Sequence, residues 1–427
     1  MNPLNVLKRV EVIDIPFIGM SEEELQIPPS FDQEAEVRSV EEGEVTPTPI
    51  LEVTEPILLD GFIDGVQRTV RWKICRTPEG ARIPIHISAI GTGLLWRDND
   101  GHPLIGHKRI WYILVGPFAE MEKDPEIADK LALELGALTQ SEVYNDPFLL
   151  LSSQKQWIVA DTSVKLGEMK SSIGKSELLN ESVVRTKAMG RIAHLRTYLE
   201  LSILIGIRSI QKDSPHWLRE VGEKHFIPDL LKLTSVEHPF LLLDGPLLLT
   251  AKRRERIRSL LPRASGSEVE RFLLRRAAGF IKTHRLRVRE IEKVLNLHAG
   301  ERSRAYDLTR ETDLHGQNLK EEITDDGYPS RHLTFYLRML ERKESSLYGL
   351  IRIDLHRSAV NPEKAVLEHE KPLNPNEQKM LNQIAAGIFR ERFPLLQGRF
   401  QPAPIALLED ALHSSIPPAI VLKNLIY

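Results

Sequence analysis

The sequence predicts an α/β or α+β domain built around one mixed β-sheet. Apolar segments typical of strands come first, at 57–63, 67–75 and 82–95. A long helical pattern at 185–209 follows, and further strand-like and helical segments alternate after it. Strands followed by helices mixed with more strands are the pattern expected of a sheet covered by helices.

The bulk composition is that of an ordinary folded chain. Of 427 residues, 41% are hydrophobic and 27% are charged, which is enough to bury a large core. The formal net charge is -3, so any surface for nucleic acid must be local. The single cysteine, Cys75, excludes an intrachain disulfide and a cysteine-rich zinc site. With no pattern of a signal peptide or membrane span, we expect a cytoplasmic protein that does not enter a membrane.

Composition divides the chain at about residue 50. Residues 1–50 form an acidic N-terminal segment that we expect to be partly disordered, since its stretch from Ser21 to Pro49 is rich in Glu and Pro. Its apolar start, Leu4 to Phe17, is either a docking segment for a partner or a frayed terminus. Residues 51–427 form the main domain, with an irregular insertion at about 137–184.

Later segments complete the expected fold. Ala278–Lys282 has the pattern of a buried strand, and 374–393 and 405–412 have helical spacing. Segments 332–340 and 350–356 alternate between apolar and polar residues, so we expect neighbouring antiparallel strands there.

Two acids follow apolar strand-like segments and precede a glycine. Asp64 comes after Leu58–Ile63, and Asp244 comes after three consecutive leucines. Each acid alone is better interpreted as an ordinary turn residue. Two such segments that both end in Asp-Gly suggest a shared metal site, for which Asp60 is a rival to Asp64.

Glu200 and His413 are further candidates. Glu200 lies on a helix that is apolar on every side, so its charge needs a cation. Arg196, one turn earlier, and a metal ion are equally good explanations. His413 ends an apolar helix and is either a metal ligand or a structural hydrogen-bonding group.

These residue types suit phosphodiester hydrolysis by divalent ions. Two ions about 3.5–4 Å apart can activate water and stabilise the leaving oxygen. Hard cations such as Mg²⁺ and Mn²⁺ bind carboxylate oxygens, and imidazole binds Mn²⁺ more readily than Mg²⁺.

A basic helical region at about 252–310 contrasts with the acidic chain as a whole. It is either a DNA-binding surface or a solvated helix face. We take as candidate DNA contacts Arg253, Arg254, Arg275, Arg276, Lys282, Arg285 and, from the late hairpin, Arg338. Asp354 in that hairpin is either an extra metal ligand or the partner of an arginine on the neighbouring strand, and we favour cross-strand pairing.

Short segments in a fixed order resemble the NurA family of nucleases. They are Phe62-Ile63-Asp64-Gly65, Arg196-Thr197-Tyr198-Leu199-Glu200, Leu242-Leu243-Asp244-Gly245-Pro246, Gly279-Phe280-Ile281-Lys282, Phe335-Tyr336-Leu337-Arg338, Gly349-Leu350-Ile351-Arg352-Ile353-Asp354 and Pro404-Ile405 through His413. Together they run from about residue 56 to 420, and their order is the specific part of the resemblance.

The resemblance implies an α/β RNase H-like mixed sheet flanked by helices. It also implies a DNA nuclease with 5′-to-3′ exonuclease and single-strand endonuclease activity that uses Mn²⁺ or Mg²⁺, with two ions. Asp64, Glu200, Asp244 and His413 would be the metal ligands and catalytic residues. The implied partners are DNA, a second copy of the chain and a HerA-type hexameric translocase, in DNA end processing or phage defence. An inactive adaptor of the same fold and an RNase of the same fold are the alternatives.

Overall fold

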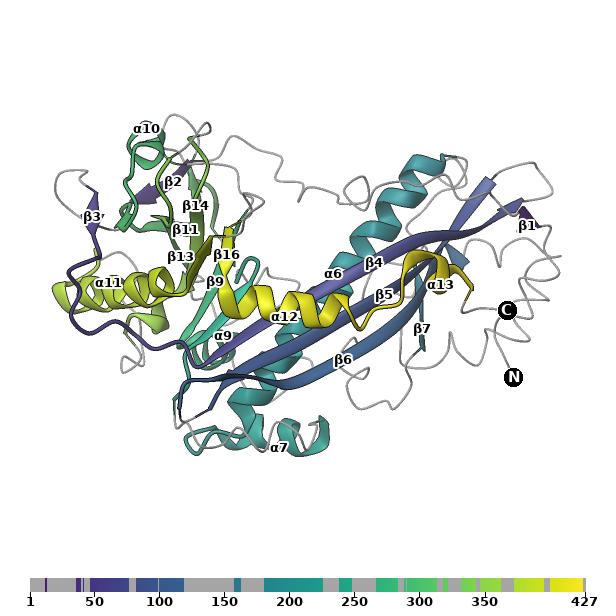
Figure 1. The fold of residues 1–427 in the computed structure, drawn as a ribbon, viewed down its shortest axis with the longest axis horizontal. Coiled ribbons are helices and arrows are strands. Elements are labelled where there is room, and N and C mark those ends of the chain that lie inside the picture. The colour runs from purple at the N-terminus through teal and green to yellow at the C-terminus, as the bar shows by residue number, and fades with distance from the viewer. Residues whose placement is uncertain are drawn as a thin grey trace.

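The structure is a computed structural model, and it describes most of the main domain. The residues described are 12–13, 36–39, 41, 47–76, 82–98, 100–118, 157–162, 180–225, 238–247, 266–282, 288, 290–312, 318–321, 332–342, 346–361, 372–394 and 400–424. Their strands form one 14-stranded mixed sheet and a separate two-stranded sheet, and helices lie on both faces of the large one (Figure 1). The expected α/β class with a mixed sheet is thus confirmed.

Three long antiparallel strands form one half of the large sheet. They are β4 (Gly61–Arg76), β5 (Arg82–Arg97) and β6 (Pro103–Gly116), and β7 (Trp157–Asp161) adds a parallel strand beside β6. The turn expected at Asp64-Gly65 is wrong, because β4 continues through it and pairs Asp64 with Gly93. The β-branched residues Val66, Thr69 and Val70 follow directly, and such residues favour an extended chain.

The other half of the sheet begins beside β4. Strand β8 (Leu241–Asp244) runs parallel to β4, and β9 (Ala277–Ile281) runs parallel to β8. Strands β13 (His332–Arg338) and β14 (Leu350–His356) pair antiparallel from His332↔His356 to Arg338↔Leu350, which confirms the expected hairpin. The remaining described strands are β10 (Glu301–Arg302), β11 (Tyr306–Thr312) and β12 (Asn318–Glu321), and β15 (Arg392–Pro394) pairs with β16 (Phe400–Pro402) in the small sheet.

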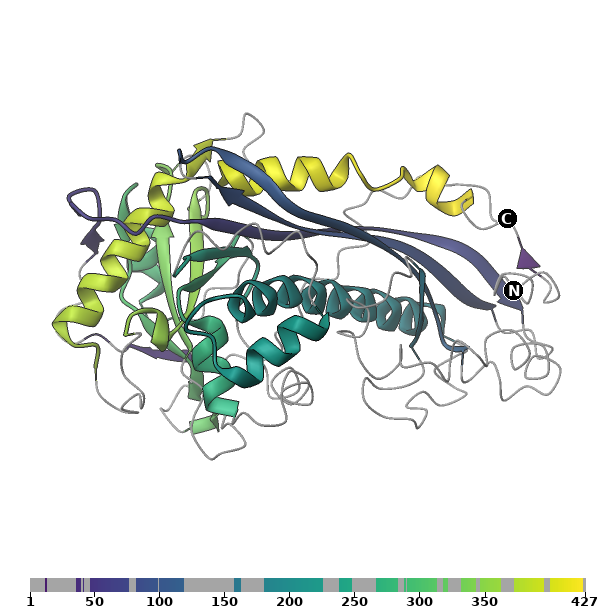
Figure 2. The same cartoon turned by 90° about the horizontal axis from the view of Figure 1, so that it is seen from below.

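Helices cover the two faces of the large sheet in two groups. In Figure 2 the C-terminal helices α12 (Ala403–His413) and α13 (Ala419–Asn424) lie on one side of the long strands, and α6 (Glu181–Ser209) lies on the other. The first face joins α11 (Pro375–Arg390) and α12 to a core that includes Phe62, Leu242 and Phe280. The second face joins α6, α7 (His216–His225) and α9 (Gly266–Leu274) to a core that includes Ile63 and Leu243. The short helix α10 (Ile291–Leu295) lies near β13.

Local sequence explains the two longest helices. Asn180 accepts a hydrogen bond from the Ser182 amide at the start of α6, and every residue of α6 from Tyr198 to Ser209 is buried. This confirms the long buried helix expected here. Helix α11 begins with a capping box between Asn374 and Glu377, and such reciprocal bonds satisfy amides that the first helical turn leaves open.

Parts of the acidic N-terminal segment are strands of the large sheet. Strand β1 (Val12–Ile13) pairs with β4, β2 (Glu36–Ser39) pairs with β11, and β3 (Thr48–Pro49) pairs with β10. Between them, Glu41 forms an ion pair with the buried Arg302 at 2.8 Å. The described part of residues 1–50 therefore belongs to the fold of the main domain.

Several expected features lie wholly or partly outside the described residues. The expected insertion at 137–184 lies outside the described residues except for β7 and the start of α6. The same holds for the basic stretch 252–265, after which α9 begins at Gly266. None of the helices described combines the length and apolar character that crossing a membrane requires.

Candidate metal centre

The parallel pairing of β4 and β8 brings Asp64 and Asp244 together. The register pairs Ile63 with Leu243, so the acids that follow these two residues occupy neighbouring positions on the same face of the sheet. Asp64 is only 3% exposed, although β4 continues past it. Asp244 ends β8, and the chain turns away at Gly245, whose φ of 115° suits glycine.

The environment of Asp64 disfavours its charge. Burial raises the pKa of this carboxyl well above its ordinary value, and the negative charge of Asp244 raises it further. Lys282 lowers the pKa, whereas Glu200 and Glu409 add to the increase. The Asp64 carboxylate accepts one hydrogen bond, from the Gly65 amide at 2.7 Å. Asp64 therefore lies among three acids and one cation.

Lys282 supplies the positive charge of this centre. Its Nζ lies 2.8 Å from Oδ2 of Asp244 and 4.0 Å from Oε2 of Glu409. Burial raises the pKa of Asp244 more strongly than Lys282 lowers it. Burial alone would lower the pKa of Lys282, but the neighbouring acids, Asp244 foremost, raise it overall. The lysine thus remains charged and offsets part of the negative charge.

Glu200 approaches the centre from α6, on the other side of β4. The Oε1 atom of Glu200 lies where a Cβ atom on Gly65 would be, so the glutamate packs against the face of β4 opposite to the one that the Asp64 side chain occupies. Arg196 pairs with Glu200 at 3.4 Å. The structure thus provides the arginine partner expected for Glu200, and the charge of Glu200 also raises the pKa of Asp64.

Helix α12 adds Glu409, a residue that the sequence interpretation missed. Glu409 lies one helical turn before His413, and its Oε1 is 3.6 Å from the His413 Nε2. The spacing of four residues is the signal that could have identified it, because such residues share a helix face. The structure joins His413 to the centre through Glu409.

The two rival acids have structural partners. The Asp60 carboxylate accepts a hydrogen bond from the Phe240 amide at 2.7 Å and so fixes the start of β8. Burial raises the pKa of Asp60, against the charges of Arg276 and Arg97. Asp354 accepts two hydrogen bonds from Arg352, both at 3.0 Å, and one from Thr334 on the neighbouring strand. The arginine partner expected for Asp354 is therefore on its own strand.

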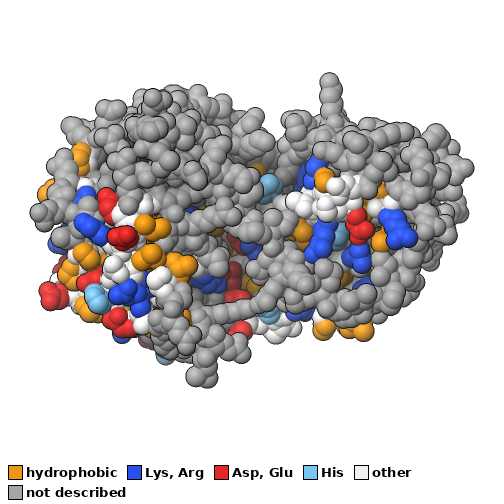
Figure 3. All heavy atoms as spheres, turned by 90° about the horizontal axis from the view of Figure 1, so that it is seen from above, with side chains coloured by type: hydrophobic (Ala, Val, Ile, Leu, Met, Phe, Trp, Pro, Cys, Tyr) orange, Lys and Arg blue, Asp and Glu red, His pale blue; other side chains and the backbone are white. Residues whose placement is uncertain are grey.

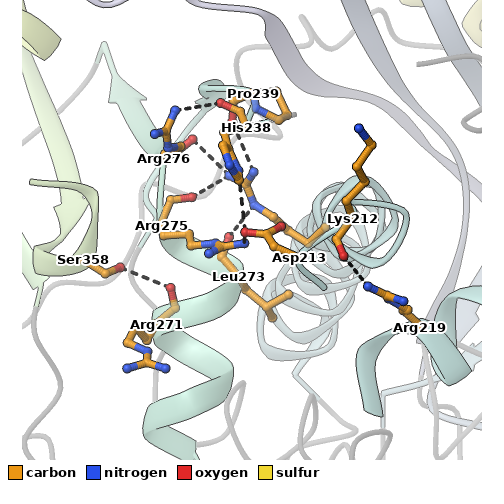
Figure 4. A network of polar contacts seen from close by, with 11 residues as sticks. Lys212, Asp213, Arg219, His238, Pro239, Arg271, Leu273, Arg275, Arg276 and Ser358 are labelled. Carbon is orange, nitrogen blue, oxygen red and sulfur yellow. Dashed lines mark hydrogen bonds and ion pairs between the residues drawn. The ribbon is translucent and has the colours of Figure 1, made fainter. Parts of the chain in front are cut away.

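Most of the arginines described among the candidate DNA contacts are tied to protein atoms. Arg338 is fully buried and donates to four backbone oxygens, those of Leu295, Leu297, Ser346 and Tyr348. This position argues against a direct contact with DNA. Arg275 pairs with Asp213 at 2.6 Å, and Arg276 donates to the His238 carbonyl at 3.0 Å (Figure 4). The other three, Arg253, Arg254 and Arg285, lie outside the described residues.

The described surface does not add a continuous basic face. In Figure 3, lysine and arginine side chains stand in separate groups, with acidic ones among them, over the described part of one side of the molecule. Of the candidate contacts that the structure describes, Lys282 alone lies within the acidic centre, where its side chain is 30% exposed.

A second acidic group lies at the turn between β5 and β6. Among the described residues, only Asp98, Asp100 and His102 place three possible ligand atoms within 4.8 Å of one another. The Asp98 carboxylate accepts hydrogen bonds from the amides of Asp100 and His102, at 3.0 and 2.8 Å, which is how such a turn is built. The group is largely exposed, and its hydrogen bonds already explain its shape.

The buried centre has donors of the kind that Mg²⁺ and Mn²⁺ prefer. The acids of this centre act electrostatically on one another, His413 lies beside Glu409, and burial together with acidic neighbours leaves negative charge that a divalent ion would neutralise. The donors are spread more widely than in the Asp98 group, and Lys282 is closest to Asp244. The residue types fit a divalent ion, whereas their ligand atoms are not gathered within 4.8 Å of one another as those of the Asp98 group are.

Comparison with known protein families finds no match for this chain, and comparison with curated protein sequences finds none either.

Proposed function

We propose that the protein is a metal-dependent nuclease that cleaves DNA, with Asp64, Glu200 and Asp244 as metal ligands. The observation that carries this proposal is the position of Asp64, a buried carboxyl whose charged neighbours are three acids and Lys282. Uncompensated buried carboxylates are costly, so proteins keep them mainly where they bind cations or take part in chemistry.

The strand order supports an RNase H-like interpretation of the fold. Three antiparallel strands, β4 to β6, precede a long helix, and two parallel strands, β8 and β9, then add beside β4. This sequence of elements brings the beginning of β4, with Asp64, beside the end of β8 in the middle of the sheet. It agrees with the fold that the resemblance to NurA proteins implies.

Each residue has a separate role in the proposed reaction. Bound Mn²⁺ or Mg²⁺, as two ions, would supply an activated water and neutralise charge on the leaving oxygen. Asp64, Asp244 and Glu200 would hold these ions, and Glu409 and His413 would complete the site from α12. Lys282, released from Asp244 on loading, would bind a phosphate oxygen of the DNA strand.

The test is Mn²⁺-dependent cleavage of labelled single-stranded DNA. Wild type should cleave it, and Asp244→Asn should reduce the rate by at least ~100-fold, since loss of a metal-ligand shell member costs this order. Asp98→Asn, in the exposed acidic turn, is the matched control and should keep the wild-type rate. Equal rates for wild type and Asp244→Asn would overturn the proposal. An RNA strand of the same sequence distinguishes DNase from RNase.

A second candidate function is an inactive adaptor of the same fold. The observation in its favour is the 2.8 Å ion pair between Lys282 and Asp244, in which the lysine takes the position of a cation. In either case we propose a HerA-type ring translocase as the partner, together with a second copy of this chain. The adaptor alone predicts that wild type binds the translocase but leaves DNA intact with Mn²⁺.

A further inference from the structure

A second group of titratable side chains is buried beneath α9, away from the acidic centre. It consists of Glu270 on α9, His332 on β13 and His356 on β14, which are 1%, 0% and 2% exposed. The two histidines are directly opposite each other in the strand register. None of these residues has a role in the function proposed above.

The contacts within this group converge on the glutamate. The Nε2 atom of His332 lies 3.8 Å from Oε1 of Glu270, and Nε2 of His356 lies 3.8 Å from Oε2. Both distances exceed a hydrogen bond. They lie within the span of two ligands on one ion, because two metal bonds of about 2.1 Å separate their donor atoms by at most ~4.2 Å.

His332 has a deficit that calls for a ligand. Both of its ring nitrogens are buried without a hydrogen-bond partner. Buried polar atoms are almost always paired, and an unpaired one commonly marks an ion or water. The ring packs edge-on against His356, with centroids 5.4 Å apart. Since no hydrogen bond fixes the His332 ring, it can turn its Nε2 toward the carboxylate of Glu270.

His356, by contrast, is already oriented. Its Nδ1 lies 2.7 Å from the Ser358 hydroxyl, which donates in turn to the Arg271 carbonyl at 3.2 Å. In one tautomer Nδ1–H donates to Ser358, and Nε2 keeps a lone pair toward Glu270. In the other, Nδ1 accepts from the Ser358 amide at 3.2 Å. Metal-binding histidines are typically held through their second nitrogen in the first manner.

We propose that Glu270, His332 and His356 bind one transition-metal ion of the Zn²⁺ class. Two imidazoles and a carboxylate are a usual ligand set for such ions, and their preference for nitrogen separates this site from the oxygen-rich acidic centre. The ion links α9 to the hairpin of β13 and β14. The three donors are less tightly gathered in this structure than the Asp98 group, so binding includes a turn of the His332 ring.

The experiment uses Co²⁺ as a spectroscopic probe of the full chain. The Asp64→Asn/Asp244→Asn variant, in which two carboxylates of the acidic centre are replaced, is stripped with chelator and titrated with Co²⁺. It should bind one ion with visible absorption typical of nitrogen ligation. Adding Glu270→Gln or His332→Asn should weaken this binding at least about tenfold. Adding His102→Asn, in the exposed turn, should leave it unchanged.

X-ray absorption at the cobalt edge supplies a measurement that needs no further substitution. Scattering from two imidazole rings is the expected result. Absence of imidazole scattering, or Co²⁺ affinity that survives both Glu270→Gln and His332→Asn, would overturn the inference. Because the parent variant lacks Asp64 and Asp244, these results do not depend on whether the chain is a nuclease.

Discussion

Buried charged side chains lie at both ends of strands β8 and β9. At one end the charge is hydrogen-bonded to the backbone, and at the other end acids outnumber the cations near them. Before the strands begin, the guanidinium of Arg208 donates to four carbonyls, those of Pro239, Leu273, Arg275 and Arg276, at 2.6–3.2 Å. After they end, Asp64 and Asp244 share Lys282 and lie beside two more acids. A guanidinium that is hydrogen-bonded to several carbonyls has a structural role. An excess of buried acids over cations, by contrast, indicates a site for a positive ion.

Removal of the Arg208 guanidinium should have the largest effect on stability. Arg208→Met keeps the side-chain volume but leaves four buried carbonyls without this donor, so we expect a loss of about 3–5 kcal/mol in the free energy of unfolding. Chemical denaturation measures it. Arg219→Met is the control, since Arg219 is exposed and bonds one carbonyl, that of Lys212. A change below ~1 kcal/mol for Arg208→Met would contradict the structural role assigned to Arg208.

Loss of Lys282 from the acidic centre should come next. Lys282→Met leaves Asp244 without its partner, and we expect about 2–3 kcal/mol of destabilisation at neutral pH. The deficit should shrink as the pH falls through the raised pKa of Asp244, because the protonated acid needs no cation. Lys108→Met, at an exposed lysine bonded to Ser415, provides the comparison. A deficit independent of pH would contradict this explanation.

Removal of the Asp64 charge should increase the free energy of unfolding. Asp64→Asn abolishes a buried charge among acids, so we expect a gain of roughly 1–2 kcal/mol at neutral pH, with loss of cleavage. The pKa of Asp64 is raised in the fold, so the wild type loses stability as the pH rises above 3.8 and through that raised pKa. The gain should therefore grow over this range. Thermal unfolding at several pH values measures this gain. A destabilised variant would show that the neighbours of Asp64 stabilise its charge.

The smallest effect should come from the residue that α12 contributes. Glu409→Gln keeps the size of the side chain but removes one charge near Lys282. We expect the Mn²⁺ concentration needed for half-maximal DNA cleavage to rise about tenfold. Asp410→Asn, on the exposed side of the same helix, should leave this concentration unchanged. Equal behaviour of the two variants would exclude Glu409 from the centre.

Local patterns in the sequence predicted much of this architecture. The alternation at β13 and β14 gave the hairpin, the apolar helix α6 was recognised as buried, and three leucines before Asp244 marked β8. These features depend on neighbours within one element. Asp64 was singled out for a turn that does not exist, since the Asp-Gly pair lies inside a continuous strand, where Gly65 packs against the Glu200 side chain.

Features that depend on packing between elements were not predictable. The alternation of β13 indicated one polar face, and polar faces are usually solvated. Here His332 and Arg338 on that face are fully buried, with α9 contributing Glu270 opposite the histidines. Likewise Glu409 joins the acidic centre only because α12 packs across β4. No pattern within a single segment reveals which face a later helix will cover.

Mn²⁺ binding to the acidic centre is the most direct test of the central claim, that carboxylates of β4, β8 and α6 hold divalent ions. In a calorimetric titration, wild type should bind one or two more Mn²⁺ ions than the Asp64→Asn/Asp244→Asn variant. Equal numbers of bound ions, with equal affinity, would contradict the account.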